Sequence, residues 1–430
     1  MGKFLGTLFL VFSSFFFANP DPVIWSGIGY FVDSGKTSSI YPSLTALEKD
    51  LKLAKLISEK FSSNENIIIG GSENRSSDEG LNSSLLAITS EKIFSNYRGK
   101  NPLNGSHLCY RTYLLGSQVV LYSINDKKIL KAFPSTTKKT FIDEDDKSQC
   151  KNSSVDLNLH KARFADILWG SDFAREGVGK DFVNNYSASN LSLEGMLEEQ
   201  ITKILNLKNV FANGNQPIGV RQVNISDYAN NQLIGTGDFS PHQDFVLNSR
   251  LNSKELKEWL GAEFSKWLSQ DLKIPIVPFY EGEGLTLNIG TTFSNSAEAL
   301  NLKKPELSYG FDYVLRGFRK ADVGETQTQK GSIWSVYSGI KFGVVLGDGP
   351  EDIKNLATMP FTQSTSKQYN KTDIINDWDY FDETAEVGMR EVSQNLIKQN
   401  KKWMKESSEI SSKDFRNFAK IILNKVGYEK

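Results

Sequence analysis

Residues 1–18 constrain this chain most, because they indicate the compartment in which it folds. Lys3 is the only charged residue among them, and the run from Phe4 to Phe17 is almost wholly apolar. A basic start, a short apolar run and a small residue before a cleavage point are the features of a secretory signal peptide. We therefore expect residues 1–18 to be a signal peptide, with cleavage after Ala18.

The expected location of the mature chain is periplasmic or secreted, with an uncleaved amino-terminal anchor as the alternative. No later stretch is long and apolar enough to span a bilayer as a helix, which takes about 20 residues. The formal net charge of the 430-residue chain is −1. This balance gives no electrostatic reason to expect a nucleic acid partner. We expect the partners to be proteins of the cell envelope, and the oligomeric state stays open.

The chain has two cysteines, Cys109 and Cys150. In an oxidising compartment, an isolated pair of this kind favours a disulfide over two free thiols. A Cys109–Cys150 bond would close a loop of about 40 residues and stabilise the fold by roughly 3–4 kcal/mol. The alternative is two unrelated cysteines, one in a strand and one in a loop.

Helical and strand patterns alternate along the chain. The clearest strand–turn–strand pattern covers Leu108 to Phe133, and the clearest amphipathic helix starts at Ser253. Such alternation predicts an α+β fold with mixed α/β layers, in which helices pack on mainly antiparallel or mixed sheets. We expect two α/β sandwich-like domains, at 19–150 and 151–430, with a possible further boundary near 207–217.

Several local predictions depend on polarity and alternation. The polar residues 134–156 predict a linker or long loop, and the apolar residues from Ile274 to Tyr280 predict a strand. Asp312 and Arg316 fall on one face of a predicted strand, which favours a surface ion pair between them. The apolar stripe of the helix at Ser253 indicates that this helix faces the core, because its polar face is not basic as in a membrane-surface helix.

The two halves share an order of helix, strand, acidic turn and strand. Residues 118–122, followed by Asp126, are similar in pattern to residues 341–345, followed by Asp348. A diverged duplication would produce this similarity, as would coincidence between two short segments.

Gly35, Lys36 and Thr37 match the end of a phosphate-binding loop. That loop has a first glycine five residues before the second, which is position 30 here. The residue at that position is Tyr30, in a run that reads as a strand. The spacing therefore argues against nucleotide binding.

The histidines and cysteines form no recognisable metal or nucleophile motif. His107, His160 and His242 are far apart, and no pair of cysteines has zinc-ligand spacing. His242 lies in a Ser-Pro-His-Gln-Asp segment without the nucleophile elbow of a serine hydrolase. We predict no metal site and no cofactor.

The candidates for catalysis are two carboxylates, Glu281 and Glu283. They follow a predicted strand end, where a general acid and base could lie beside a sugar-binding cleft. Aromatic residues that could line such a cleft are available elsewhere in the chain. The alternative is an ordinary acidic turn without catalytic function.

Four short segments carry a resemblance to a known type of domain: FDYVLRGF (311–318), IKFGVVLGD (340–348), DYFDETAEV (379–387) and VVLYSINDKKILKAF (119–133). Together they resemble periplasmic domains of the TolB amino-terminal and curli-secretion-lipoprotein type. The resemblance covers about half of the chain. The chain departs from this type of domain in two ways. Asp-Lys-Lys stands where a turn glycine is usual, and the lipidation cysteine is missing. The resemblance implies a scaffolding or adaptor role in the periplasm, without catalysis.

Three functional hypotheses follow. The first is an extracytoplasmic, non-catalytic binding or scaffolding protein of the cell envelope. The second is a glycan-acting hydrolase that uses acidic loop residues such as Glu281 and Glu283. The third is a solute-binding protein with two lobes around a cleft. Whether the chain is an enzyme stays uncertain, although the lack of a catalytic motif favours the first hypothesis.

Overall fold

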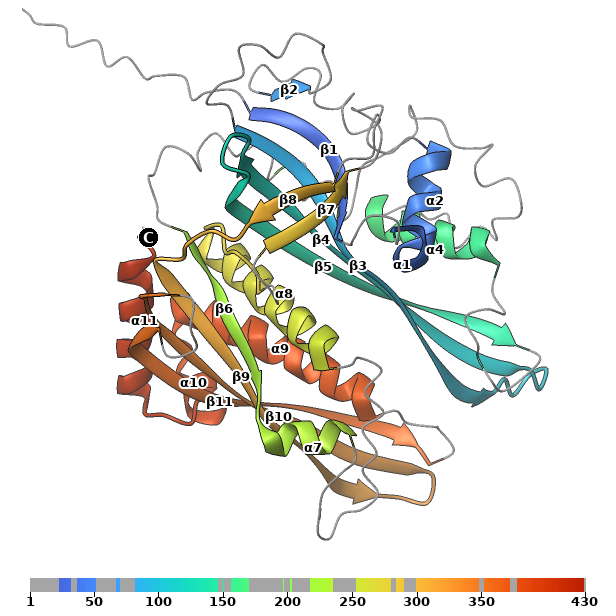
Figure 1. Cartoon of the computed structure of the whole chain (residues 1–430). Coiled ribbons are helices and arrows are strands. Elements are labelled where there is room, and N and C mark those ends of the chain that lie inside the picture. Colours follow the sequence, from blue (N-terminus) through green and yellow to red (C-terminus); the bar gives the residue numbers. More distant parts are fainter. Residues whose placement is uncertain are drawn as a thin grey trace, which may run out of the picture.

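The computed structural model has two mixed β-sheets separated and flanked by helices (Figure 1), which confirms the α+β fold class. The described residues are 23–31, 37–51, 67–69, 82–145, 150, 156–169, 196, 202, 217–234, 253–279, 284–289, 299–347, 352–371 and 377–428.

The first sheet is built around a long antiparallel meander of β3, β4 and β5. The parallel strand β1 lies beside β3. In spatial order, the strands of the first sheet are β2 (Ile67–Ile69), β1 (Val23–Phe31), β3 (Asn82–Lys100), β4 (His107–Ser123), β5 (Lys128–Asp145), β8 (Ala299–Lys303) and β7 (Gly284–Ile289).

The first sheet also closes on itself, because β7 pairs with β1 as well as with β8. Leu302 of β8 belongs to a small apolar cluster with Leu85 and Val120 of the same sheet. Strands β7 and β8 thus belong to a sheet formed mainly by residues before 150. The domain boundary near residue 150 stays a prediction.

The second sheet has the order β11 (Ile353–Asn370), β10 (Gln329–Val345), β9 (Tyr309–Glu325) and β6 (Ile218–Ile225). Here too, three long strands form an antiparallel meander, and the parallel strand β6 lies beside the first of them. Aromatic residues such as Phe311, Tyr313 and Trp334 fill its helix-facing side and are almost fully buried.

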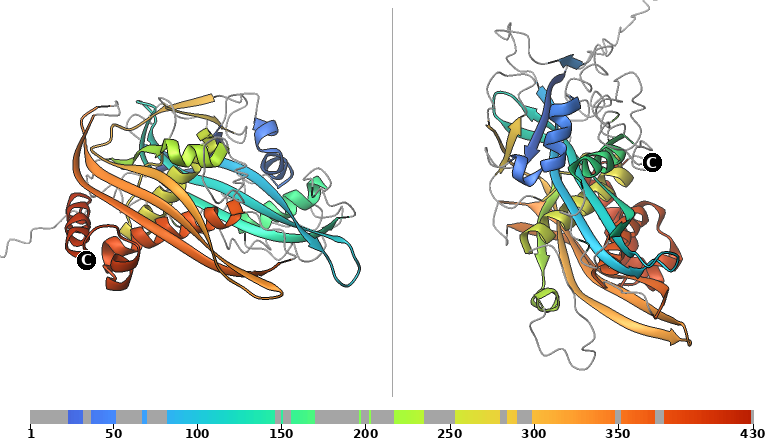
Figure 2. Two further views of the ribbon diagram at one scale, coloured as in Figure 1. Left: turned by 90° about the horizontal axis from the view of Figure 1, so that it is seen from below. Right: turned by 90° about the vertical axis from the view of Figure 1, so that its right-hand side faces the viewer.

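The helices form layers on these sheets (Figures 1 and 2). Helices α8 and α9 pack on each other and lie between the sheets, with α8 touching β5 and β6 and α9 touching β10 and β11. Helices α2 and α4 pack together on the opposite face of the first sheet. The bounds are α1 (Thr37–Ile40), α2 (Pro42–Leu51), α4 (Leu157–Trp169), α7 (Asp227–Ile234), α8 (Ser253–Leu272), α9 (Asp377–Lys398), α10 (Lys401–Glu406) and α11 (Ser412–Lys425).

One topology occurs twice in the chain. The first half runs β1, α2, β3, β4, β5, α4, and the second half runs β6, α8, β9, β10, β11, α9. In each half the first strand is parallel to the second, and the following strands form a meander. The helices α1 and α7, strand β2 and the β7–β8 hairpin are additional to this order. The repeat is what a duplication would produce.

Helix α8 shows why the apolar stripe in its sequence predicts burial. Leu256, Leu260, Phe264 and Leu268 recur every four residues, and each is almost fully buried. They pack into the main core with the aromatic residues of the second sheet. The expectation that this helix faces the core is therefore confirmed.

Two of the predictions from local polarity were wrong. Residues 134–145 are not a loop, because β5 continues to Asp145 and pairs with β4 throughout. Within the described residues 274–279, only Val277 bridges another strand, at Gly219. Pro275 and Pro278 lack the N–H groups that a regular strand donates, which explains the interruption.

The predicted Asp312–Arg316 ion pair was also wrong. Asp312 accepts hydrogen bonds from both Nε and Nη2 of Arg221 on β6, at 3.0 and 2.7 Å. Arg316 instead donates to Glu409, at 2.8 and 2.9 Å. Arg221, on the neighbouring strand β6, pairs with Asp312 in place of Arg316. The spacing of residues along β9 does not indicate this partner, because Arg221 is on another strand.

Candidate functional site

The candidate site lies on a projecting part of the first sheet, which we call the arm. It consists of the outer ends of β3, β4 and β5, at residues 92–100, 107–113 and 139–145, and the turn 101–106. The strands pair along this whole length. Figure 1 shows the ends of β3 and β4 extending beyond the helices.

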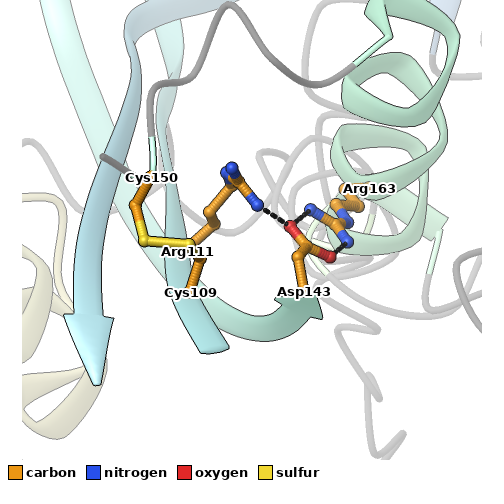
Figure 3. Close-up of a disulfide and its surroundings, with 5 residues drawn as sticks. All are labelled: Cys109, Arg111, Asp143, Cys150 and Arg163. Carbon is orange, nitrogen blue, oxygen red and sulfur yellow. Dashed lines mark hydrogen bonds and ion pairs between the residues drawn. A yellow bond between two sulfur atoms is a disulfide. The ribbon is translucent and has the colours of Figure 1, made fainter. Parts of the chain in front are cut away.

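A disulfide anchors the arm (Figure 3). Cys109 lies in β4 and Cys150 follows β5, with a Cα–Cα distance of 5.5 Å and a sequence separation of 41 residues. Both side chains are buried. The predicted pairing is confirmed, and it fixes the chain that leaves β5 toward α4 against the middle strand of the arm.

A buried ion cluster joins the arm to α4 beside this disulfide. Asp143 of β5 lies between Arg111 of β4 and Arg163 of α4, and Arg163 donates to both carboxylate oxygens (Figure 3). The exposed fractions of the two arginine side chains are 1% and 5%. Burial alone would raise the pKa of Asp143, but hydrogen bonds and charges from Arg163 and Arg111 outweigh burial and lower it.

Aromatic residues complete the cluster. The Tyr113 hydroxyl lies 2.7 Å from Nδ1 of His160 and accepts a hydrogen bond of 3.0 Å from Arg163. The Arg163 guanidinium is also 4.7 Å from the ring centre of Phe141, in cation–π geometry. Burial raises the pKa of Tyr113 above its usual value.

Asp143 is not placed to act as a general acid or base. A general acid or base needs a pKa near the working pH, whereas the pKa of Asp143 lies below its ordinary value, so that it stays ionised. Its two arginine partners are charged at any physiological pH. The cluster therefore fixes α4 to the arm.

The turn at the tip of the arm is held by a set of hydrogen bonds. The side chains of Asn101 and Asn104 donate to the two carboxylate oxygens of Glu144 on β5, at 2.7 and 3.0 Å. Their side-chain oxygens accept from the backbone N–H groups of Leu103 and Ser106, both at 3.0 Å. The hydrogen bonds from Asn101 and Asn104 also lower the pKa of Glu144.

Leu103 projects from this turn with 93% of its surface exposed. Gly105 follows with a φ of 73°, a conformation that favours glycine and lets the chain return into β4. Ile142 on β5 is also exposed, at 60%. The tip thus exposes an apolar side chain on a turn whose backbone is held by hydrogen bonds.

A second charged cluster lies between the first sheet and the helices α8 and α9. Lys138 of β5 reaches Asp382 and Glu386, which are one turn apart on α9, at 2.6 and 3.2 Å. Nearby on α8, Glu263 is 1% exposed and pairs with Lys266 at 3.2 Å. Burial raises the pKa of Asp382 and of Glu263. This cluster connects the two halves of the chain.

The residues predicted for catalysis lie outside the described part of the chain. Glu281 and Glu283 fall between 279 and 284, and His242 falls between 234 and 253. The catalytic hypothesis for the two glutamates stays a prediction. Of the other histidines, His107 is opposite Asp145 in the arm, and His160 belongs to the cluster around Tyr113.

The described residues contain no group of three or more His, Cys, Asp or Glu side chains placed to hold a metal ion. No helix within the described ranges has the length and apolar character to cross a membrane.

The arm tip was not among the predictions made from the sequence. The segment Asn101-Pro102-Leu103-Asn104-Gly105 has the composition of a turn, and it could have been recognised as one. The strand before it was missed too, since most of β3 after Ile88 is polar. A comparison with protein-family models and with curated proteins finds no match to this chain.

Proposed function

We propose that this chain is an extracytoplasmic, non-catalytic binding or scaffolding protein of the cell envelope, and that the arm tip is its contact with a protein partner. The observation that carries the proposal is the fixed, exposed position of Leu103. The disulfide between Cys109 and Cys150 is compatible with a periplasmic or secreted location.

The turn at the arm tip is preorganised, which lowers the entropic cost of binding. A single exposed leucine is common on protein surfaces. A flexible loop, however, loses conformational entropy when a partner orders it, and this cost weakens binding. Here the hydrogen bonds to Asn101, Asn104 and Glu144 fix the turn before any partner arrives. Burial of one leucine side chain then stabilises a complex by about 1.5–3 kcal/mol.

The ion cluster and the disulfide support the same role from below the tip. They fix the middle of the arm to α4 and to the chain after β5, so that the tip belongs to an anchored structure rather than to a free hairpin. A partner with an apolar pocket and a polar rim would complement Leu103 and the surrounding asparagines.

The test is in-cell crosslinking of the tagged chain followed by identification of envelope proteins that co-purify. Leu103→Asp is compared with Leu346→Asp, a change at a leucine that is 70% exposed and lies in another part of the fold. We expect one or two envelope proteins with the wild-type chain and with Leu346→Asp, and their loss with Leu103→Asp. An unchanged set of proteins with Leu103→Asp would contradict the role of the tip.

A further inference from the structure

The carboxy-terminal helices have a marked excess of positive charge. Residues 398–428 contain eight basic and three acidic residues, whereas the whole chain has a net charge of −1. The rest of the chain is therefore net negative. The basic residues are Lys398, Lys401, Lys402, Lys405, Lys413, Arg416, Lys420 and Lys425, and the acidic ones are Glu406, Glu409 and Asp414.

On α11 the basic residues form a stripe that faces solvent. Lys413, Arg416 and Lys420 are spaced by three and four residues, so they lie on one side of the helix, and all three are exposed. The opposite side carries Phe415 and Phe418, which are buried in the main core. Helix α11 therefore presents charge outward and keeps its apolar side inside the protein.

Helix α10 extends the same arrangement. Lys401, Lys402 and Lys405 are exposed, while Trp403 and Met404 between them are buried. Helices α10 and α11 contact each other. We call the six exposed residues of these two helices the basic face: Lys401, Lys402, Lys405, Lys413, Arg416 and Lys420.

The local carboxylates offset only part of this charge, because three acidic residues stand against eight basic ones and leave a net charge of +5 (8 − 3). Glu409 is engaged by Arg316 at 2.8 Å, and Asp414 interacts with Ser411 at the start of α11. Within the described residues, no carboxylate forms an ion pair with a member of the basic face. The six side chains are thus available to an external anion.

We propose that the basic face docks on the surface of an anionic phospholipid bilayer. Five of its six members are lysines, whose point charges suit a plane of phosphate headgroups better than bidentate recognition of one group. The aromatic residues Trp403, Phe415 and Phe418 of these helices are buried, so they cannot stack on single-stranded nucleic acid. Since the apolar side of α11 is also buried, the contact is electrostatic and peripheral.

The basic face is separate from the arm, so the two surfaces can be occupied at the same time. Figures 1 and 2 show α11 at one end of the molecule and the tip of the β3–β4 hairpin at the other. A chain docked by its basic face would hold the arm away from the bilayer, where a partner could reach it.

The test is sedimentation of the full chain with vesicles of phosphatidylcholine alone or with a quarter phosphatidylglycerol. We expect binding only to the anionic vesicles at low salt, and its loss at high salt through screening. Vesicles of phosphatidylcholine alone also report any insertion of the apolar amino-terminal segment, which does not need anionic headgroups. Each basic residue near such a surface raises the affinity of the chain for the vesicles about fivefold.

The decisive comparison uses two triple variants with the same change in net charge. Lys402→Gln, Lys413→Gln and Lys420→Gln together should lower the affinity roughly a hundredfold. The matched control replaces three exposed lysines outside the basic face by glutamine: Lys303, Lys341 and Lys354. Circular dichroism verifies that both variants fold.

Three outcomes would overturn the proposal. The first is no binding of the wild-type chain to anionic vesicles at low salt. The second is an equal loss of affinity in the control variant, which would show that the basic face is not the contact. The third is binding to soluble heparin without binding to vesicles, which would assign the face to a soluble polyanion.

Discussion

Replacement of Lys138 by methionine should destabilise the contact between the two halves of the chain. Lys138 of β5 forms ion pairs with two carboxylates of α9, those of Asp382 and Glu386. The exposed fraction of the Lys138 side chain is 18%. Methionine retains most of the aliphatic length, including contact with Trp259, over which the ammonium lies at 5.0 Å from the ring centre. The change therefore removes the charge with little loss of packing.

The magnitude follows from the burial of the carboxylates. At about 3 Å and an effective dielectric constant of about 20, each ion pair contributes roughly 5 kcal/mol of attraction, most of which offsets desolvation. Removing one partner of a buried pair costs about 3–5 kcal/mol. Because Asp382 and Glu386 keep 22% and 30% exposure, we expect the lower limit, about 3 kcal/mol.

The loss should depend on pH with a definite sign. Burial holds the pKa of Asp382 above its ordinary value, and without Lys138 that pKa rises further. A carboxyl whose pKa is raised by folding stabilises the folded state at low pH, and this contribution is lost as pH rises through the folded pKa. The deficit of Lys138→Met relative to the wild-type chain should therefore be smaller at pH 5 than at pH 7.

Urea unfolding followed by tryptophan fluorescence measures this effect. With a denaturant slope of about 3 kcal/mol per molar, the midpoint at pH 7 should fall by about 1 M. Lys354→Met, at an exposed lysine of β11, is the control and should leave the midpoint unchanged. A deficit that is equal at pH 5 and pH 7, or a midpoint shift no larger than that of the control, would refute the reasoning.

Three further predictions concern single contacts. Serine at both Cys109 and Cys150 should lower stability by about 3–4 kcal/mol, seen as a lower thermal midpoint that no longer responds to reductant. Asp143→Asn should cost about 3 kcal/mol at neutral pH. The pKa of Asp143 is lowered by folding, so its contribution disappears as pH falls through that pKa, and urea midpoints of variant and wild type should converge in acid. Trp334→Phe loses the 2.7 Å hydrogen bond to Asp377 and should cost about 1–3 kcal/mol in thermal unfolding, whereas an unchanged midpoint would contradict this.

The parts of the fold that follow from local patterns were predictable. The helix at Ser253 has a continuous apolar stripe, and the start of α11 has a capping residue, Ser411, whose hydroxyl accepts from the N–H of Asp414. The turn between β4 and β5 lies between alternating strands that the pattern from Leu108 to Phe133 indicates. In each case the residues that decide the structure are within a few positions of one another.

The parts that depend on distant partners were not predictable. Strand β5 continues through polar residues because β4 pairs with it along the arm, where both faces carry charged side chains. The partner of Asp312 is Arg221, which is 91 residues away. The Asp143 cluster joins three elements, and the sequence pattern gives no sign that α4 packs on the arm. Cys109 and Cys150 are the exception, because the chain has no other cysteines to pair.

The most direct test of the proposed function places a photoreactive phenylalanine derivative at position 103 and irradiates cells that express the chain. The same derivative at position 346, another exposed leucine, is the control. The account predicts a crosslink to a defined envelope protein from position 103 and none to that protein from position 346. The same products from both positions, or none from position 103, would contradict the claim that the arm tip binds a partner.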